Sequence, residues 1–342
     1  MAETTEKSGK SVRGRDSNIQ INAKDIREKI YRRLRRVAEK QHYGFIGKYT
    51  AVKICTWTKK SIKDEGYCYK QKFYGIQSHL CCQFSPTVGF CQNRCIFCWR
   101  NIEDTIGTEM DEYDDVDMII EQLPKMQKKL LSGLGGYEGT NMDKLKQAFT
   151  PRHFAISLTG ETLTYPKINE LIRKLNKIGS TFVVSNGLLW EKVKDLEPPT
   201  QLYISLDAPN EELFKKIDRS VFKDGWKRLM KTLDILREMR KKTRTVLRLT
   251  IIKGMNDVFP EQWAELIRRA DPMFVEVKGY MFVGASRNRM SIENMPRHEE
   301  VKEFALKIAD VLGYKLIDEK KESRVVLLME KDFDGRIMNF DY

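Results

Sequence analysis

The sequence predicts an α/β protein built around an open six-stranded (β/α)6 barrel, which is a partial TIM barrel. From His153 onward, short apolar runs rich in β-branched residues alternate with amphipathic helical segments. Apolar strands joined by crossover helices indicate a parallel sheet that is covered on both faces. Six such units are fewer than the eight strands of a closed barrel, so we expect the barrel to stay open.

The individual elements follow from the apolar pattern. Ile168, Leu171, Ile172 and Leu175 are spaced as on one face of a helix, which places a crossover helix between two strands. A final helix at 301–312 precedes two apolar runs at 314–318 and 324–329, which predict a terminal β-hairpin. The six barrel strands are predicted at 85–90, 154–158, 181–185, 202–206, 245–252 and 273–277.

The N-terminal part differs from the barrel. Residues 1–22 are poor in apolar side chains and predict a disordered tail. Ile26, Ile30, Leu34 and Val37 then follow helical spacing among many arginines. We therefore expect four parts: the tail at 1–22, a basic helix and cysteine region at 23–83, the barrel core at 84–313, and a C-terminal hairpin and tail at 314–342.

Positive charge is in excess and clustered. Lys and Arg number 61 against 48 Asp and Glu. Residues 24–36 hold seven basic and two acidic side chains, and residues 237–253 hold seven and one. Such stripes attract phosphates and favour RNA as a partner, although each could also be a solvated helix face. The acidic stretch at 103–117 would repel a polyanion, so we expect it to lie away from the RNA-binding face.

Nothing in the sequence predicts a membrane or secreted protein. Apolar runs fall short of the roughly 18 to 20 residues that a membrane span needs. The cysteines end at Cys98, and no apolar signal segment precedes them. We expect a reduced, cytoplasmic monomer without membrane contact.

The most specific feature is the crowding of all seven cysteines between Cys55 and Cys98. Cys91, Cys95 and Cys98 read C-x3-C-x2-C, here called the downstream triad. Three thiolates can bind three irons of a [4Fe-4S] cluster and leave the fourth open to a small molecule. A zinc site is the main alternative, because C-x2-C is also common in zinc sites.

A second set of cysteines precedes the first. Cys55, Cys68 and Cys81, here called the upstream triad, are each separated by twelve residues. Three further thiolates suggest a second [4Fe-4S] cluster with an open iron, the alternative being buried free thiols. Cys82 has no assigned role.

Polar residues follow the predicted strands at their carboxyl ends. Because these ends meet at one mouth of a barrel, their side chains are candidates for binding a cofactor. Hydroxyl and amide groups there suit ribose hydroxyls and a carboxylate. Asn-Gly and Lys-Gly pairs are also ordinary turn signals. The candidates are Thr159, Gly160, Glu161, Ser185, Asn186, Ser205, Asp207, Asn256 and Lys278.

The downstream triad resembles the signature of the radical S-adenosylmethionine (SAM) superfamily, whose usual fold is the open barrel. The resemblance implies that SAM chelates the open iron and yields a 5′-deoxyadenosyl radical on reduction. Thr159-Gly160-Glu161 resembles the Gly-Gly-Glu motif that holds the SAM ammonium in that superfamily. Thr159 replaces the first glycine.

The complete pattern C-x12-C-x12-C-x9-C-x3-C-x2-C, with Lys70 inside it, resembles the tRNA 4-demethylwyosine synthase family. The match is to the compact archaeal form, which lacks a flavodoxin-like half. This implies two [4Fe-4S] clusters, SAM and a separate electron donor of the ferredoxin or flavodoxin type. It also implies that N1-methylguanosine beside the anticodon of phenylalanine tRNA condenses with two carbons of pyruvate. In the family, a lysine at the position of Lys70 forms a Schiff base with pyruvate.

Other assignments stay open at this level. Lys70 could be a solvated lysine, with Lys63 and Lys72 as rivals for the catalytic role. The protein could be another radical SAM enzyme that modifies RNA or protein, an electron carrier, or a zinc-bound RNA-binding protein without chemistry. Trp57 and Trp99 could stack on an extruded base or shield a cluster. A loop with Tyr280, Phe282, Arg287, Asn288 and Arg289 is a candidate surface for tRNA.

Overall fold

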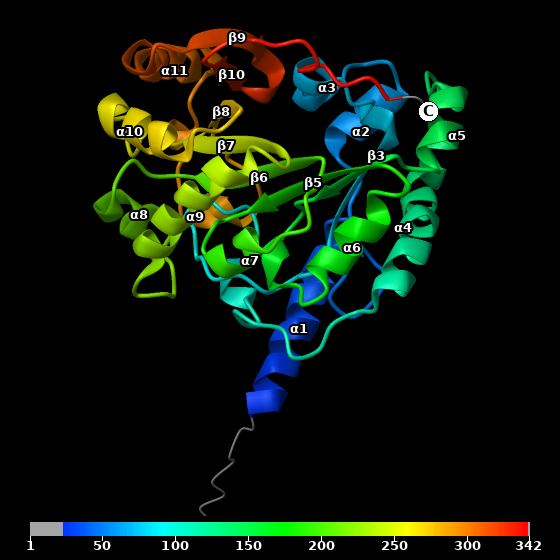
Figure 1. Ribbon diagram of the computed structural model, residues 1–342. Helices are drawn as coiled ribbons and strands as arrows, with labels where there is room; N and C mark the ends of the chain where they lie inside the picture. The colour runs from blue at the N-terminus through cyan, green and yellow to red at the C-terminus, as the bar shows by residue number, and fades with distance from the viewer. Residues whose placement is uncertain (1–22, 341–342) are drawn as a thin grey trace, which may run out of the picture.

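The structure is a computed structural model that describes residues 23–340, so the predicted tail at 1–22 lies outside the described residues. A single open sheet of ten strands runs through it, in the order β1-β2-β3-β4-β5-β6-β7-β8-β10-β9 (Figure 1). Strands β3 to β8 pair in parallel, each with the next along the chain. The predicted six-stranded open barrel is confirmed.

Five of the six barrel strands largely match their predicted ranges, and the first shares only Ser85 with its range. β3 ends at Ser85, so residues 86–90 form the loop that leads to Cys91, and the predicted core boundary at 84 falls inside β3. Pro86 lacks a ladder donor, and Gly89 has a φ of +94°, which explains why the strand stops. The strands are β3 (Cys81–Ser85), β4 (His153–Ile156), β5 (Ser180–Ser185), β6 (Gln201–Leu206), β7 (Arg244–Ile251) and β8 (Phe274–Gly279).

Antiparallel strands extend the barrel at both edges. β1 (Gly44–Phe45) and β2 (Ala51–Val52) precede β3 and were not predicted. The predicted C-terminal hairpin is present as β9 (Lys315–Lys320) and β10 (Val325–Met329), and β10 pairs with β8. The hairpin and the first helix lie at opposite ends of the molecule (Figure 1).

Helices separate the strands, as the sequence pattern predicts. In the part of the chain that the structure describes, none is long and apolar enough to cross a membrane. The helices are α1 (Ala23–Lys40), α2 (Thr56–Ile62), α3 (Tyr69–Tyr74), α4 (Val116–Leu131), α5 (Met142–Ala148), α6 (Ile168–Leu175), α7 (Trp190–Lys194), α8 (Glu211–Ile217), α9 (Gly225–Met239), α10 (Pro260–Ala270) and α11 (His298–Leu312).

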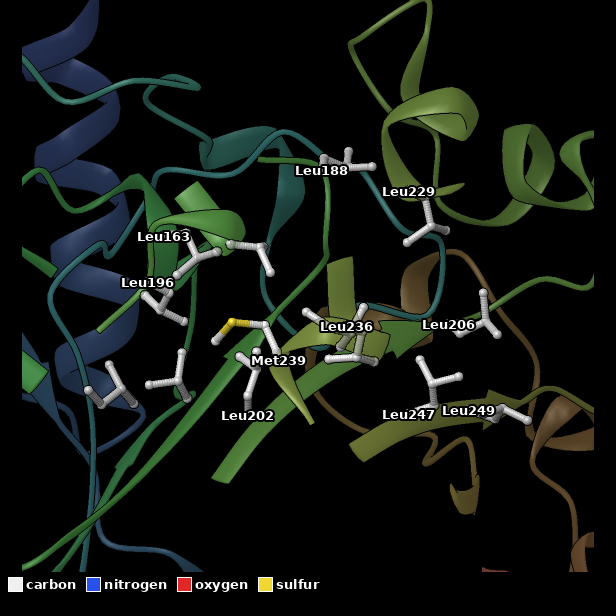
Figure 2. Close-up of a cluster of buried hydrophobic side chains, with 14 of the residues drawn as sticks. Leu163, Leu188, Leu196, Leu202, Leu206, Leu229, Leu236, Met239, Leu247 and Leu249 are labelled. Carbon is white, nitrogen blue, oxygen red and sulfur yellow. The ribbon is translucent and has the colours of Figure 1, made fainter. Parts of the chain in front are cut away.

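The main core fills the space between the convex face of the sheet and its helices. Leu247 and Leu249 of β7 pack there with Leu236 and Met239 of α9 (Figure 2). Because side chains alternate along a strand, the residues between these leucines point to the concave face. Burying one such leucine contributes about 1.5–3 kcal/mol.

The concave face has its own core, which α3 closes. Phe73 and Tyr74 of α3 pack with Phe182, Tyr203 and Phe274 from the inward face of the strands. These bulky side chains fill the barrel around α3, and the remaining concave side chains are largely polar. The short helix α3 therefore carries its first residues directly into the barrel interior.

Two expectations about charge are wrong. The basic stretch at 237–253 is not one surface, because Arg244 and Arg248 belong to β7 and point inward. The acidic stretch at 103–117 lies against the basic helix α1 instead of apart from it. Arg27 pairs with Asp111 at 2.9 Å, and Arg33 pairs with a second carboxylate in the stretch. Part of the charge on α1 is thus neutralised within the chain.

Candidate functional site

A cavity of about 410 Å³ opens inside the barrel and is lined by all three cysteines of the upstream triad. Lys70, Arg248 and Lys278 line the same cavity. Phe97 and Trp99, from the loop of the downstream triad, reach its wall as well. The cavity therefore connects the surroundings of the two triads.

Three separate elements bring the upstream triad together. Cys55 immediately precedes α2, Cys68 immediately precedes α3, and Cys81 opens β3. Burial, together with the neighbouring Cys55 thiol, raises the pKa of Cys68 to about 12. Burial also raises the pKa of Cys81, with both other thiols adding to the effect. These thiols would have to lose their protons in order to bind a metal.

Cys82 lies next to Cys81 but on the opposite face of β3. It is fully buried in the convex core with Phe84, in keeping with the alternation of side chains along a strand. Its thiol is therefore separated from the cavity by the sheet itself. Cys82 is a core side chain.

Lys70 is the one of the three rival lysines that lines the cavity. Its Nζ lies 4.3 Å from the ring centroid of Tyr203 and 5.0 Å from that of Phe182. Burial lowers the pKa of Lys70, while the charge of a nearby glutamate opposes the shift. Lys72 instead pairs with Asp318 of the hairpin at 2.7 Å. Lys63 Nζ lies 3.3 Å over the ring of Tyr137.

Two more cations share the wall with Lys70. Lys278, a candidate for binding the cofactor, lies beside the upstream triad, because its strand places it on the concave face near Arg248. Its Nζ donates to the Ser323 carbonyl at 2.6 Å, and burial lowers its pKa to about 8. Sequence reasoning missed Arg248. The signal was the alternation along β7, which puts Arg244 and Arg248 on the face opposite its leucines.

The downstream triad lies in the loop after β3, and neighbouring elements hold this loop through its backbone. The amide of Arg94 donates to the Asp218 carbonyl at 3.0 Å, and the amide of Ile96 donates to the Ile217 carbonyl at 2.9 Å. The guanidinium of Arg289 donates to the carbonyls of Ile96, at 3.1 Å, and Cys98. Arg289, a candidate for contacting tRNA, is therefore a clamp on the cysteine loop.

Buried polar groups surround the three downstream thiols. Cys91 Sγ accepts from the amide of Asn93 at 3.4 Å, and Cys95 donates to Asp218 Oδ1 at 3.5 Å. Burial raises the pKa of Cys91 and of Cys95. Among the described residues, Asp218 Oδ2 and Asn93 Oδ1 are buried without a hydrogen-bond partner. Buried acceptors of this kind fit a site that is completed by a bound cofactor with donor groups.

Residues 159–161 fold back against the loop before Cys91. Gly160 has a φ of +76°, and a Cβ atom there would lie 2.1 Å from the Thr87 carbonyl oxygen, so only glycine fits. The carboxylate of Glu161 accepts from Ser185 Oγ and from the Asn186 amide, both at 2.7 Å. Asn186 Nδ2 in turn lies 3.8 Å from Cys91 Sγ.

The structure thus brings Glu161, Ser185 and Asn186 together beside the downstream triad. Thr159 is also near, and its carbonyl accepts from Ser85 Oγ. Burial raises the pKa of Glu161, while its hydrogen bonds act in the opposite direction. The Glu161 carboxylate links the loop after β4 to the end of β5, and the Glu161 amide donates to the Phe90 carbonyl next to Cys91.

The remaining candidates, Ser205, Asp207 and Asn256, differ in how many of their side-chain polar atoms already have hydrogen-bond partners within the protein. Burial raises the pKa of Asp207 to about 6, and its carboxylate accepts from the Thr250 amide at 3.2 Å. Ser205 accepts from Arg248 at 3.3 Å. Asn256 Oδ1 accepts a hydrogen bond from the backbone amide of Ile252 at 2.6 Å, and Asn256 Nδ2 donates to the Asp207 carbonyl at 2.8 Å. Asn256 shapes the strand end with its side chain, so this geometry does not support its predicted contact with a cofactor.

Comparisons with known proteins show the family to which the chain belongs. Residues 85–270 match the Radical SAM superfamily, and residues 269–330 match a family described as Wyosine base formation. The S-adenosyl-L-methionine-dependent tRNA 4-demethylwyosine synthase of Pyrococcus abyssi is 46% identical over 302 residues, which covers 86% of this chain and 88% of the relative. The synthase of Methanocaldococcus jannaschii is 41% identical, over 90% of this chain and 97% of the relative.

A relative from Xenopus laevis is 37% identical over 95% of this chain, which spans 44% of that longer protein. Two solved structures share the fold. A structure of TYW1 with a lysine-pyruvate adduct bound has a TM-score of 0.80 and 37% identity, and covers 90% of this chain and 98% of that chain. An archaeal TYW1 has a TM-score of 0.71 and 35% identity, over 87% and 95% of the two chains. The chain therefore belongs to the S-adenosyl-L-methionine-dependent tRNA 4-demethylwyosine synthases, a family of radical SAM enzymes.

Proposed function

We propose that this enzyme condenses N1-methylguanosine beside the anticodon of phenylalanine tRNA with two carbons of pyruvate, forming the tricyclic base 4-demethylwyosine. The observation that carries the proposal is the shared cavity. Lys70, the upstream triad and side chains from the downstream loop all line it. A relative with 37% identity holds a lysine-pyruvate adduct, which supports pyruvate as the second substrate.

The downstream triad would hold the [4Fe-4S] cluster that membership of the radical SAM family implies. With SAM bound there and one electron from a separate donor, this site would supply the 5′-deoxyadenosyl radical that abstracts hydrogen from the N-methyl group. Asp207 and Asp218 lie buried beside this triad, and burial raises the pKa of both side chains. A positively charged group of SAM bound there would favour their ionised forms. Ser205 and Asn186 offer a hydroxyl and an amide for further polar contacts.

We propose a second [4Fe-4S] cluster at the upstream triad, where three half-buried cysteines face one cavity beside Lys70. Lys70 attacks the keto carbon of pyruvate as a neutral amine, and burial favours loss of its proton. The addition product loses one water to give a Schiff base. Arg248 and Lys278 attract the pyruvate carboxylate to the same wall.

The target base enters the cavity from its aromatic side. Trp57 and Trp99 line the cavity and can stack on an unstacked guanine. Arg287 and Asn288 are exposed in the loop after β8 and can contact the tRNA backbone. We further propose a cytoplasmic monomer that receives electrons from a separate ferredoxin or flavodoxin.

Mass spectrometry of nucleosides tests the proposed reaction. Anaerobically reconstituted protein is incubated with tRNA that carries N1-methylguanosine, together with SAM, reductant and pyruvate. We expect 4-demethylwyosine in the digest, and its loss when pyruvate is omitted. Formation of deoxyadenosine without any tricyclic base would overturn the proposal and leave another radical SAM reaction as the function.

A further inference from the structure

Glu276 is a buried carboxylate that the reaction outlined above does not use. It lies on β8 with none of its surface exposed. One oxygen accepts from the hydroxyl of Tyr69 at 2.9 Å, and the other accepts from the hydroxyl of Tyr74 at 2.8 Å. Two donors aimed at the two oxygens are the arrangement expected around a carboxylate.

The two tyrosines are the first and last residues of α3, the helix that carries Lys70. Glu276 therefore fastens both ends of this helix to the barrel. A helix of six residues is not stable by itself, because nucleation fixes several residues for one hydrogen bond. The direction of the Lys70 side chain thus depends on contacts that hold α3 in place.

The charge of Glu276 also faces the cations of the cavity. Lys278 lies two residues further along β8, on the same face of the strand. Three cations and no carboxylate are found among the described residues that line the cavity. Glu276 lies behind this wall, and its charge acts on both Lys70 and Lys278. A buried negative charge offsets the repulsion between cations in a low-dielectric interior.

We propose that Glu276, together with Tyr69 and Tyr74, is a positioning residue for Lys70. It fixes α3 so that the amine enters the cavity over Tyr203, and it keeps a negative charge behind that amine. The inference rests on the proposed function, in which the Lys70 nitrogen bonds to the keto carbon and one water leaves. No oxidant or reductant takes part in that step.

Trapping of the Schiff base with borohydride tests this role. Wild type, Glu276→Gln, Tyr69→Phe and Tyr74→Phe are incubated with pyruvate and reduced, and the Lys70 peptide is followed by mass spectrometry. We expect trapping to slow about tenfold or more in Glu276→Gln, because hydrogen bonds to a charged group are lost. Each phenylalanine variant should slow it less.

Tyr165→Phe is the matched control. Tyr165 is fully buried and donates a hydrogen bond of 2.6 Å to the Asp114 carbonyl, outside the cavity. The Tyr165→Phe variant should trap pyruvate on Lys70 at the wild-type rate. Deoxyadenosine formation without tRNA should match wild type in all variants, since it does not depend on where Lys70 points. Iron content is measured in each variant, because Cys68 immediately precedes α3.

The outcomes separate the two proposals. If wild type traps no pyruvate on Lys70, the proposed function fails. If wild type traps pyruvate and Glu276→Gln does so at the same rate with full iron content, the positioning role is wrong. If Glu276→Gln loses iron or has a lower melting temperature, the Tyr74→Phe variant decides, because it keeps the carboxylate. Trapping of pyruvate at the wild-type rate in Tyr74→Phe would then overturn the inference.

Discussion

The two cysteine triads differ in how they are built and in the charge around them. The downstream triad lies in one loop of eight residues, whereas the upstream triad comes from α2, α3 and β3. Two buried acidic side chains, Asp207 and Asp218, lie near the downstream thiols, and so do the guanidinium groups of Arg94 and Arg100. Cations surround the upstream thiols. The cavity wall beside the upstream triad therefore suits an anionic keto acid, whereas groups of both charges lie near the downstream thiols.

Breaking the downstream side should have the largest effect. Cys95→Ala removes a thiolate from the proposed SAM cluster, so deoxyadenosine formation should fall below detection in a chromatographic assay. Borohydride trapping of pyruvate on Lys70 should persist, because the upstream side is intact. Loss of both reactions would show that the two triads do not function separately.

Breaking the upstream side should abolish the product and leave radical formation. Lys70→Ala removes the amine that forms the Schiff base, so mass spectrometry should find no tricyclic base. Iron content and deoxyadenosine formation should stay at wild-type levels. Lys72→Ala is the control, because its ammonium pairs with Asp318 instead of facing the cavity. Normal product from Lys70→Ala would remove Lys70 from the mechanism.

Weakening the charge contrast should have a smaller effect. Arg248→Met removes one cation from the upstream wall, and the pyruvate concentration for half-maximal rate should rise about tenfold, as expected for a lost charged hydrogen bond. Arg237→Met removes a cation of the same basic stretch whose guanidinium donates at the surface to the Arg268 carbonyl. An equal effect of both variants would contradict a local role for Arg248.

The pH dependence of stability sharpens the contrast further. The pKa of Lys278 is lowered to about 8 from its ordinary value of 10.5. Between these values the folded chain binds fewer protons at Lys278 than the unfolded chain, so its contribution to the free energy of unfolding rises with pH. The free energy of unfolding in urea should rise between pH 8 and pH 9 by about 1 kcal/mol more in wild type than in Lys278→Met. A constant difference between the two proteins would contradict the lowered pKa.

The smallest effect is expected for the cysteine outside both triads. Cys82→Ala removes one buried sulfur from the convex core, which should cost about 1 kcal/mol of unfolding free energy. Iron content and both partial reactions should be unchanged. Loss of iron in this variant would mean that Cys82 serves a cluster.

Much of the fold could be predicted because the signals are local. The apolar runs and the helical spacing of Ile168 and Leu171 report which side chains meet the core, and the structure bears out these elements. The first strand was misplaced, because Pro86 and Gly89 sit in an apolar segment that reads like a strand but cannot pair as one. β1 and β2 were missed because two-residue strands leave no periodic pattern.

The sequence by itself determined the downstream triad and the alternation that built the barrel, since both depend on spacings of a few residues. It also singled out Lys70, through the resemblance of the whole cysteine pattern to one family. Only the tertiary structure decided that Lys278 and Arg248 join Lys70 at one wall, and that Glu276 fastens the helix beneath it. These contacts join residues about 200 positions apart in the chain, and parallel strand pairing, which no local pattern encodes, brings them together.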